Sequence, residues 1–131
     1  MKQSALPLLL ATIWISLSEF VRNQFLLHHA WTERYNSLGL TFPEEPINGA
    51  IWGLWSLIYA SVLFILSKKF SLLQTGLLGW IIGFPMMWIV LGNLLILPFN
   101  ILPLAIPLSL LESFGAAWII HAIRKKFSAR F

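Results

Sequence analysis

A run of 42 residues without Asp, Glu, Lys or Arg, between Lys69 and Glu112, constrains the fold of this chain most strongly. As a single α-helix it would be about 63 Å long, roughly twice the ~30 Å thickness of a bilayer's hydrocarbon core. The run must therefore fold back on itself. Pro98, Phe99 and Asn100 form the expected turn, because proline lacks a backbone donor and asparagine tolerates turn geometry. The predicted crossings are residues 72–95 and 102–123.

Two further crossings are expected in the N-terminal half. The second apolar stretch has 22 uncharged residues before Lys68, which is enough for a crossing. The first is shorter, and a cleavable signal peptide is the alternative, because a basic Lys2, an apolar core and small residues precede Glu19. Apolar residues resume after Glu19, which favours one retained helix. The predicted helices are 4–27 and 46–67, joined by an extramembrane loop over 28–45.

The composition agrees with this assignment. The chain is 58% hydrophobic and 11% charged, whereas an average soluble domain is about 25% charged. At 131 residues it has the length of one domain. We therefore expect a single all-α integral membrane domain over residues 1–131, a bundle of four transmembrane helices whose immediate environment is the lipid bilayer.

The basic residues predict the orientation. If there are four spans, both termini and the connection between the second and third spans lie on one side, and the positive-inside rule makes that side cytoplasmic. A bacterial inner membrane is the expected location. Because the charge is spread over short flanking segments without a recognition fold, it does not indicate a nucleic-acid partner. Seven of the nine basic residues lie on the predicted cytoplasmic side: Lys2, Lys68, Lys69, Arg124, Lys125, Lys126 and Arg130.

Prolines and caps predict local features. Thr41 and Glu44 have the spacing of a capping box, which would start the second span. Pro85, Pro103 and Pro107 remove backbone donors inside or near the third and fourth spans and are expected to kink them.

Small residues predict helix contact faces, either within the chain or with another copy or another protein. A homo-oligomer and a hetero-complex therefore both remain open. The stripes are Gly49, Gly53, Ser56 and Ala60; Gly76, Gly79 and Gly83; and Ser109, Ser113 and Ala117.

Glu112 lies near the middle of the fourth predicted span, about 15 Å from its start at the side opposite the termini. An ionisable group at that depth is costly and marks a functional hypothesis. Glu19 and Arg22 are three residues apart on one helix, close enough to pair. The predicted polar cluster, placed in the outer half of the membrane, is Glu112, Glu19, Arg22, Asn23, Asn93, Ser109 and Ser113.

Three interpretations of the cluster stay open. It is a buried polar knot that sets helix register, a site that binds or translocates a small polar or ionic species, or part of an enzyme. An accessory or scaffold subunit of a membrane complex is the alternative function. Enzyme chemistry has the least support, because His28 and His29 lack zinc-pair spacing and no nucleophile or phosphate-loop motif occurs. We predict no catalytic residues, metal or cofactor.

Overall fold

A computed structural model describes residues 2–129, in which every regular element is helical. Four helical stretches, Lys2–Leu26, Pro46–Ser67, Leu72–Asn93 and Phe99–Ser128, are long and apolar enough to cross a membrane. This confirms the expected all-helical class with four candidate spans. Arg130, one of the basic residues named above, lies outside the described residues. The elements are α1 (Lys2–Phe20), the π-helix η1 (Val21–Leu26), α2 (His28–Ser37), α3 (Pro46–Ser67), α4 (Leu72–Gly83), α5 (Pro85–Asn93), the 3-10 helix η2 (Phe99–Ile101) and α6 (Leu102–Ser128).

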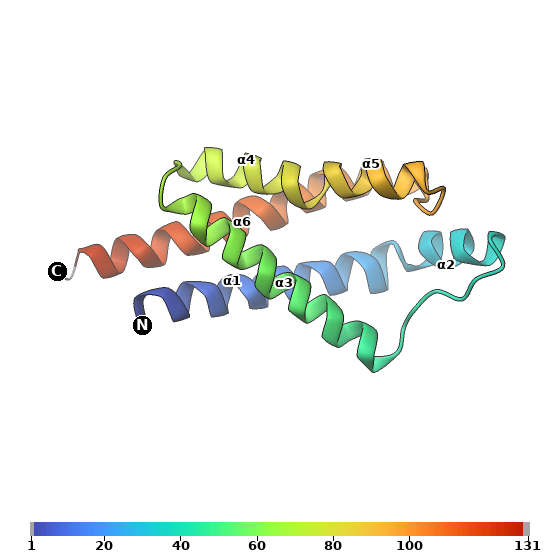
Figure 1. The fold of residues 1–131 in the computed structure, drawn as a ribbon, viewed down its shortest axis with the longest axis horizontal. Helices are drawn as coiled ribbons and strands as arrows, with labels where there is room; N and C mark the ends of the chain where they lie inside the picture. The colour runs from blue at the N-terminus through green and yellow to red at the C-terminus, as the bar shows by residue number, and fades with distance from the viewer. Residues whose placement is uncertain (1, 130–131) are drawn as a thin grey trace.

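The helices form an elongated bundle with two different ends (Figure 1). We call one the terminal end, because the start of α1, the connection between α3 and α4 and the end of α6 meet there. The other, the loop end, carries α2, residues 38–45 and the connection between α5 and α6. α4 and α5 run in line along α6, while α3 crosses α1 and α6 diagonally, so its first turns diverge from α1 at the loop end (Figure 1).

The centre of the bundle is apolar and tightly packed. α6 packs against α1 and α4, and α1 also packs against α3. The side chains at these crossings are almost completely shielded, as expected for a close-packed interior. Large apolar side chains remain exposed along all four candidate spans, which suits a lipid environment better than water. The buried core contains Ala11, Ile15, Ala60, Leu63, Ala116 and Ile120; the exposed set includes Leu9, Leu57, Ile65, Leu73, Ile89, Leu111 and Trp118.

The third and fourth spans differ in detail from the predicted helices. The third is two helices, α4 and α5, separated at Phe84, because Pro85 has no N–H to donate and disfavours helical geometry in the residue before it. Of the other two prolines, Pro103 lies in the first turn of α6, where proline is tolerated, and Pro107 lies inside that helix. The fourth span also continues past residue 123 to Ser128.

Two loop predictions were wrong in their details. Residues 28–45 were expected to be a loop, but they contain α2, which has no glycine or proline to interrupt it; it ends at Ser37 and is followed by Gly39, which has a positive φ of 73°. The capping box at the start of α3 uses Glu45 and Asn48 instead of Thr41 and Glu44. The Glu45 N–H donates to Asn48 Oδ1 at 3.1 Å, and Pro46 occupies the first helical position.

The reversal between the third and fourth spans comes earlier than predicted. α5 ends at Asn93, and the chain turns through Leu95, whose φ of 63° is in the left-handed region. Pro98, Phe99 and Asn100 follow the reversal and lead through η2 into α6. Pro98 directly precedes η2, a position that suits proline because its φ is already restricted.

Candidate functional site

Three charged side chains meet in the interior. Arg22 Nη2 lies 2.6 Å from Glu19 Oε1, and Arg22 Nη1 lies 3.4 Å from Glu112 Oε1. All three side chains are buried; Glu112 is 0% exposed. Two carboxylates therefore share one guanidinium, and with both ionised the group carries one net negative charge. Since an unpaired buried charge is costly, the group favours an additional proton or cation.

The local backbone positions this group. Glu19 lies in the last turn of α1, and Arg22 lies in the π-helical turn η1, where the Leu27 N–H donates to the Arg22 carbonyl at 2.8 Å. Wide turns of this kind are frequent at functional sites. The guanidinium of Arg22 lies 5.1 Å from the centre of the Phe84 ring, so the break between α4 and α5 supplies an aromatic face for the cation.

Glu112 is held from two sides but incompletely paired. Trp14 Nε1 donates to the Glu112 backbone carbonyl at 2.9 Å, which connects α1 to α6. The carboxylate oxygen Oε2 of Glu112 is buried and has no hydrogen-bond partner among the described residues. Buried polar atoms are nearly always satisfied, so this oxygen is where a proton would complete the group.

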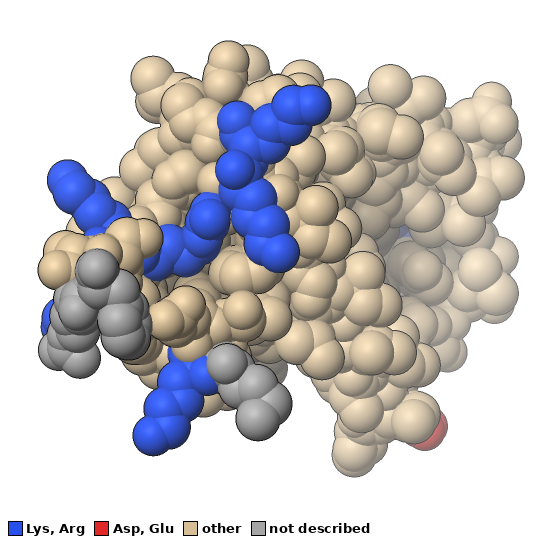
Figure 2. Space-filling view, turned by 60° about the vertical axis from the view of Figure 1, so that its left-hand side comes forward, with Lys and Arg blue, Asp and Glu red and all other residues tan. Residues whose placement is uncertain are grey.

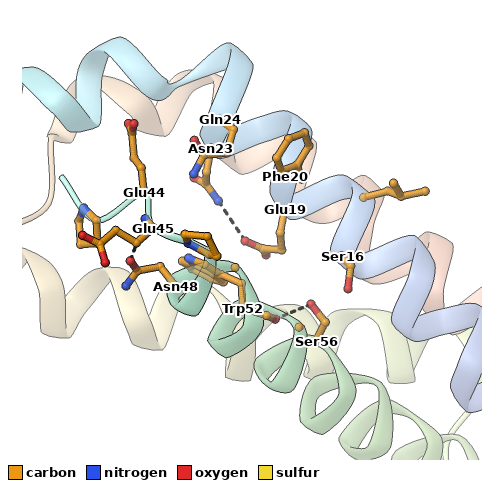
Figure 3. A pocket seen from close by; sticks show the side chains of 15 residues that line it. Ser16, Glu19, Phe20, Asn23, Gln24, Glu44, Glu45, Asn48, Trp52 and Ser56 are labelled. Atoms are coloured by element: carbon orange, nitrogen blue, oxygen red, sulfur yellow. Dashed lines mark hydrogen bonds between the residues drawn. The ribbon is translucent and has the colours of Figure 1, made fainter.

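Glu19 is the carboxylate of the group that reaches the cavities. It lines both of two adjoining cavities at the loop end, between α1 and η1 on one side and the first turns of α3 on the other. We call the first the acidic cavity; its volume is about 520 Å³ and its wall includes Glu44 and Glu45. Figure 3 shows Ser16, Glu19 and Asn23 facing Asn48, Trp52 and Ser56 across it. Asn23 Nδ2 donates to Glu19 Oε2 at 3.0 Å.

The second cavity, the aromatic cavity, has a volume of about 360 Å³. Glu19, Arg22, Asn23 and Asn48 supply its polar wall. Trp31 stacks on Phe42, with ring centres 6.1 Å apart, and Tyr35 meets the same ring edge-on at 5.3 Å. Trp31 Nε1 is buried without a hydrogen-bond partner in the described chain. The aromatic rings that line this cavity are Trp31, Tyr35, Phe42, Trp52 and Trp88.

The other predicted site residues lie elsewhere. Asn93 is exposed at the last position of α5 and lines neither cavity. Ser109 accepts a hydrogen bond from Trp80 Nε1 at 2.9 Å, and Ser113 accepts one from Tyr59 Oη at 3.1 Å while donating to the Gly76 carbonyl at 2.7 Å. Ser109 thus connects α6 to α4, and Ser113 connects α6 to both α3 and α4. The structure brings together Glu19, Arg22, Asn23 and Glu112.

Several cavity residues are not predicted by the sequence pattern. Glu44 and Glu45 have the pattern of a solvated helix start, and Trp31 that of an interfacial aromatic residue. His28 pairs with Glu44, and His29 Nε2 lies 3.5 Å from Glu33 Oε2 on the exposed face of α2. Within residues 2–129, no three His or Glu side chains lie close enough together to hold a metal ion.

Comparisons with known proteins found no matching protein family, no similar curated protein and no similar solved structure. Function is therefore inferred from the geometry of the cavities and the charged group.

Proposed function

We propose that this protein is inserted in a membrane with both ends on the cytoplasmic side and binds a small organic cation in the two cavities at the opposite side. The distribution of charge supports the orientation. Basic side chains gather at the terminal end, as Figure 2 shows, whereas Glu33, Glu44 and Glu45 belong to α2 and the following loop. Positive residues concentrate on the cytoplasmic side of membrane proteins. The basic residues concerned are Lys2, Lys68, Lys69, Arg124, Lys125 and Lys126.

The observation that carries the proposal is the position of Glu19. Its carboxylate is 4% exposed, lines both cavities and, among residues 2–129, shares its one cationic partner, Arg22, with Glu112. Together the cavity walls hold Glu19, Glu44 and Glu45 against a single arginine. A cavity with excess negative charge and little exposure to water attracts cations and repels anions.

The aromatic walls favour an organic cation over a hydrated metal ion. Tryptophan, tyrosine and phenylalanine faces attract ammonium groups within about 6 Å, and this contact strengthens as water is removed. Volumes of about 360 and 520 Å³ fall in the range of small-molecule pockets, roughly 300–1,000 Å³. In this arrangement Glu19 supplies the counter-charge, Asn23 orients it, and Trp31, Trp52 and Trp88 contact the alkyl groups.

Translocation would need a second conformation. Ile15, Leu63 and Ile120 are fully buried in the apolar core of the bundle. We call this core the apolar plug. Two polar contacts lie in the terminal half beside it, between Thr75 and His121 at 3.3 Å and between Arg124 and Ser67 at 2.7 Å. Binding is thus the step that the cavities support directly, and movement of the solute requires the plug to open.

A binding experiment tests the proposal. Purified protein is titrated with tetramethylammonium chloride, and binding is followed by the fluorescence of the cavity tryptophans, with sodium chloride at equal ionic strength as the reference. We expect saturable binding that Glu19→Gln weakens by about tenfold or more, about 1.4 kcal/mol, since the Coulombic attraction between a close cation and a carboxylate is strong in a partly buried site. Glu33→Gln removes an equal charge outside the cavities and serves as the matched control. Equal responses to tetramethylammonium and sodium, or unchanged binding in Glu19→Gln, would contradict the proposal.

A flux experiment tests translocation separately. Liposomes containing wild-type protein or Glu112→Gln at equal folded amounts are assayed for uptake of a labelled quaternary ammonium ion and for proton movement. Loss of flux in Glu112→Gln with retained binding would assign Glu112 to the movement step. Binding without flux in the wild type would limit the function to binding.

An accessory subunit is the second candidate function, and one observation favours it. A Cβ added at Gly49 or Gly53 on α3, which both line the acidic cavity, would have no neighbouring atom within 4 Å, whereas Gly83 packs against the Tyr59 ring inside the chain. A smooth, unfilled helix face is the usual contact surface between membrane helices. Recovery of a stable hetero-complex in mild detergent, lost when Gly53 is replaced by leucine, would support this candidate.

A further inference from the structure

The terminal end holds a separate cavity of about 480 Å³, distinct from the acidic and aromatic cavities of the proposed cation site. It lies between the first turn of α1, the end of α3 and the last turns of α6. Its wall has two cations, three small polar groups and two phenyl rings. The lining residues are Gln3, Ser4, Phe64, Lys68, Arg124, Phe127 and Ser128.

Two cations converge on one aromatic ring in this cavity. Lys68 Nζ lies 5.0 Å from the centre of the Phe64 ring, and the guanidinium carbon of Arg124 lies 5.6 Å from it. Arg124 is further fixed, because its Nη1 donates to the Ser67 carbonyl at 2.7 Å and to Ser67 Oγ at 2.9 Å. Both bonds use Nη1, which leaves the other guanidinium N–H groups for a further acceptor. The cations are thus positioned before any ligand arrives.

The described chain provides no carboxylate for these cations. All five of its acidic residues are glutamates, and none of them lines this cavity. Like charges held near each other raise the free energy of the folded chain, and an anion that lies between them removes that cost. Arginine and lysine together, with hydroxyl groups beside them, form the donor set that binds phosphate oxygens.

We propose that this cavity binds the phosphate of an anionic phospholipid headgroup. The inference uses the membrane insertion proposed above and is independent of the cation site. The cavity lies where the apolar helices end, at the level where headgroup phosphates of the cytoplasmic leaflet are found, and basic pockets between helix ends are known to recognise such groups. Phe64 and Phe127 provide the apolar part of the wall next to the acyl chains.

Lipid binding measured by native mass spectrometry in neutral detergent tests this proposal. Short-chain phosphatidylglycerol and phosphatidylcholine are titrated separately, and inorganic phosphate is used as a competitor. We expect phosphatidylglycerol to be retained in preference to phosphatidylcholine, and the double variant Lys68→Gln with Arg124→Gln to weaken its binding by about tenfold or more, because both charge-assisted contacts with the phosphate are lost. The double variant Lys69→Gln with Lys125→Gln removes the same charge at the same end, outside the cavity, and should change binding less than about threefold, because exposed charges away from the phosphate are screened by salt.

Each possible result either supports or overturns the proposed phospholipid site. Equal losses in the two double variants would overturn the proposal in favour of general surface attraction, as would equal retention of both lipids. Displacement of bound phosphatidylglycerol by inorganic phosphate at a concentration below that of the lipid would identify a free phosphate as the ligand and overturn the lipid as its source. Because Arg124 also contacts Ser67, the single variant Lys68→Gln, which changes only an exposed side chain, provides a test in a fold that stays intact.

Discussion

At the scale of single residues, loss of the Arg22 side chain is expected to lower the stability of the fold strongly. Arg22 balances two buried carboxylates, Glu19 and Glu112. Removing one member of a buried ionic group costs about 3–5 kcal/mol, whereas replacing the whole group by neutral side chains of similar volume is often nearly neutral. The residues of the group are therefore energetically coupled.

We predict that Arg22→Met lowers the free energy of unfolding by about 3–5 kcal/mol because both carboxylates then lose their counter-charge. Adding Glu19→Gln and Glu112→Gln to Arg22→Met should restore most of that loss. The measurement is chemical or thermal unfolding in one detergent for the single and triple variants. A triple variant no more stable than Arg22→Met would show that the arginine acts through packing on Phe84 instead.

Two helix ends with the same hydrogen bonds carry different residues at the left-handed position. After α2, the Leu40 N–H donates to the Tyr35 carbonyl at 2.9 Å and the left-handed residue is Gly39. After α5, the Ile96 N–H donates to the Leu91 carbonyl at 3.0 Å and the left-handed residue is Leu95. A side chain in this conformation costs about 1–2 kcal/mol, which glycine avoids.

We therefore expect Leu95→Gly to raise the free energy of unfolding by about 1 kcal/mol, and Gly39→Ala to lower it by about the same amount. Leu95 is 64% exposed, so little buried area is lost with its side chain. Thermal unfolding of both variants checks the pair. If Leu95→Gly were less stable, the Leu95 side chain would have to make a stabilising contact, such as one with lipid or detergent, that outweighs the backbone strain.

At the scale of elements, close packing of α1 on α6 depends on a missing side chain. A Cβ at Gly115 would lie 2.6 Å from Trp14 Nε1, the atom that donates to the Glu112 carbonyl. The Trp14 ring fills the space above the glycine, which allows the two helices to approach closely.

We predict that Gly115→Ala lowers the free energy of unfolding by about 1–3 kcal/mol, because the Trp14 ring must move and its hydrogen bond is lost. Gly49→Ala is the matched control. With nothing within 4 Å of the added carbon, it should raise that free energy by roughly 0.5–1 kcal/mol through reduced backbone entropy. The free energy of unfolding is measured in detergent for both variants, and a change in tryptophan fluorescence relative to the wild type reports movement of the Trp14 ring. Equal effects of the two substitutions would argue against this packing.

The elements also show which parts of the site could be predicted from the sequence. Hydropathy and span length predicted four crossings, because bilayer thickness sets the required length. Three-residue spacing predicted that Glu19 and Arg22 pair. Depth alone grouped Asn93 with them, but depth along a helix says nothing about rotation around it. The break at Phe84 separates α5 from α4, and Asn93 is exposed at the end of α5.

The role of the glutamates needed tertiary structure for the same reason. Counted along its span, Glu112 is closest to the middle of the membrane, yet its carboxylate contacts Arg22 and lines neither cavity. Glu19 reaches the cavities because α3 diverges from α1 at the loop end, as Figure 1 shows. Helix crossing angles depend on side-chain packing between elements that are distant in sequence. No local pattern in the α1 sequence predicts them.

At the scale of the whole molecule, the proposed orientation decides which solution reaches the cation cavities. The described residues place basic groups at the terminal end, as Figure 2 shows, and Glu33, Glu44 and Glu45 in α2 and the loop after it, so the two ends differ in charge. If the terminal end faces the cytoplasm, solutes enter from the opposite side, whereas the reverse insertion would open the cavities to the cytoplasm.

The chain contains no cysteine, so single introduced cysteines can report this orientation without background. We predict that Thr41→Cys, in the exposed loop after α2, reacts with a membrane-impermeant maleimide on intact cells. Gln3→Cys and Ser128→Cys, exposed at the terminal end, should react only after the membrane is permeabilised. Labelling of all three in detergent controls for accessibility of the thiols. Reaction of Ser128→Cys on intact cells, with Thr41→Cys protected, would reverse the orientation and make the cation cavities a cytoplasmic site.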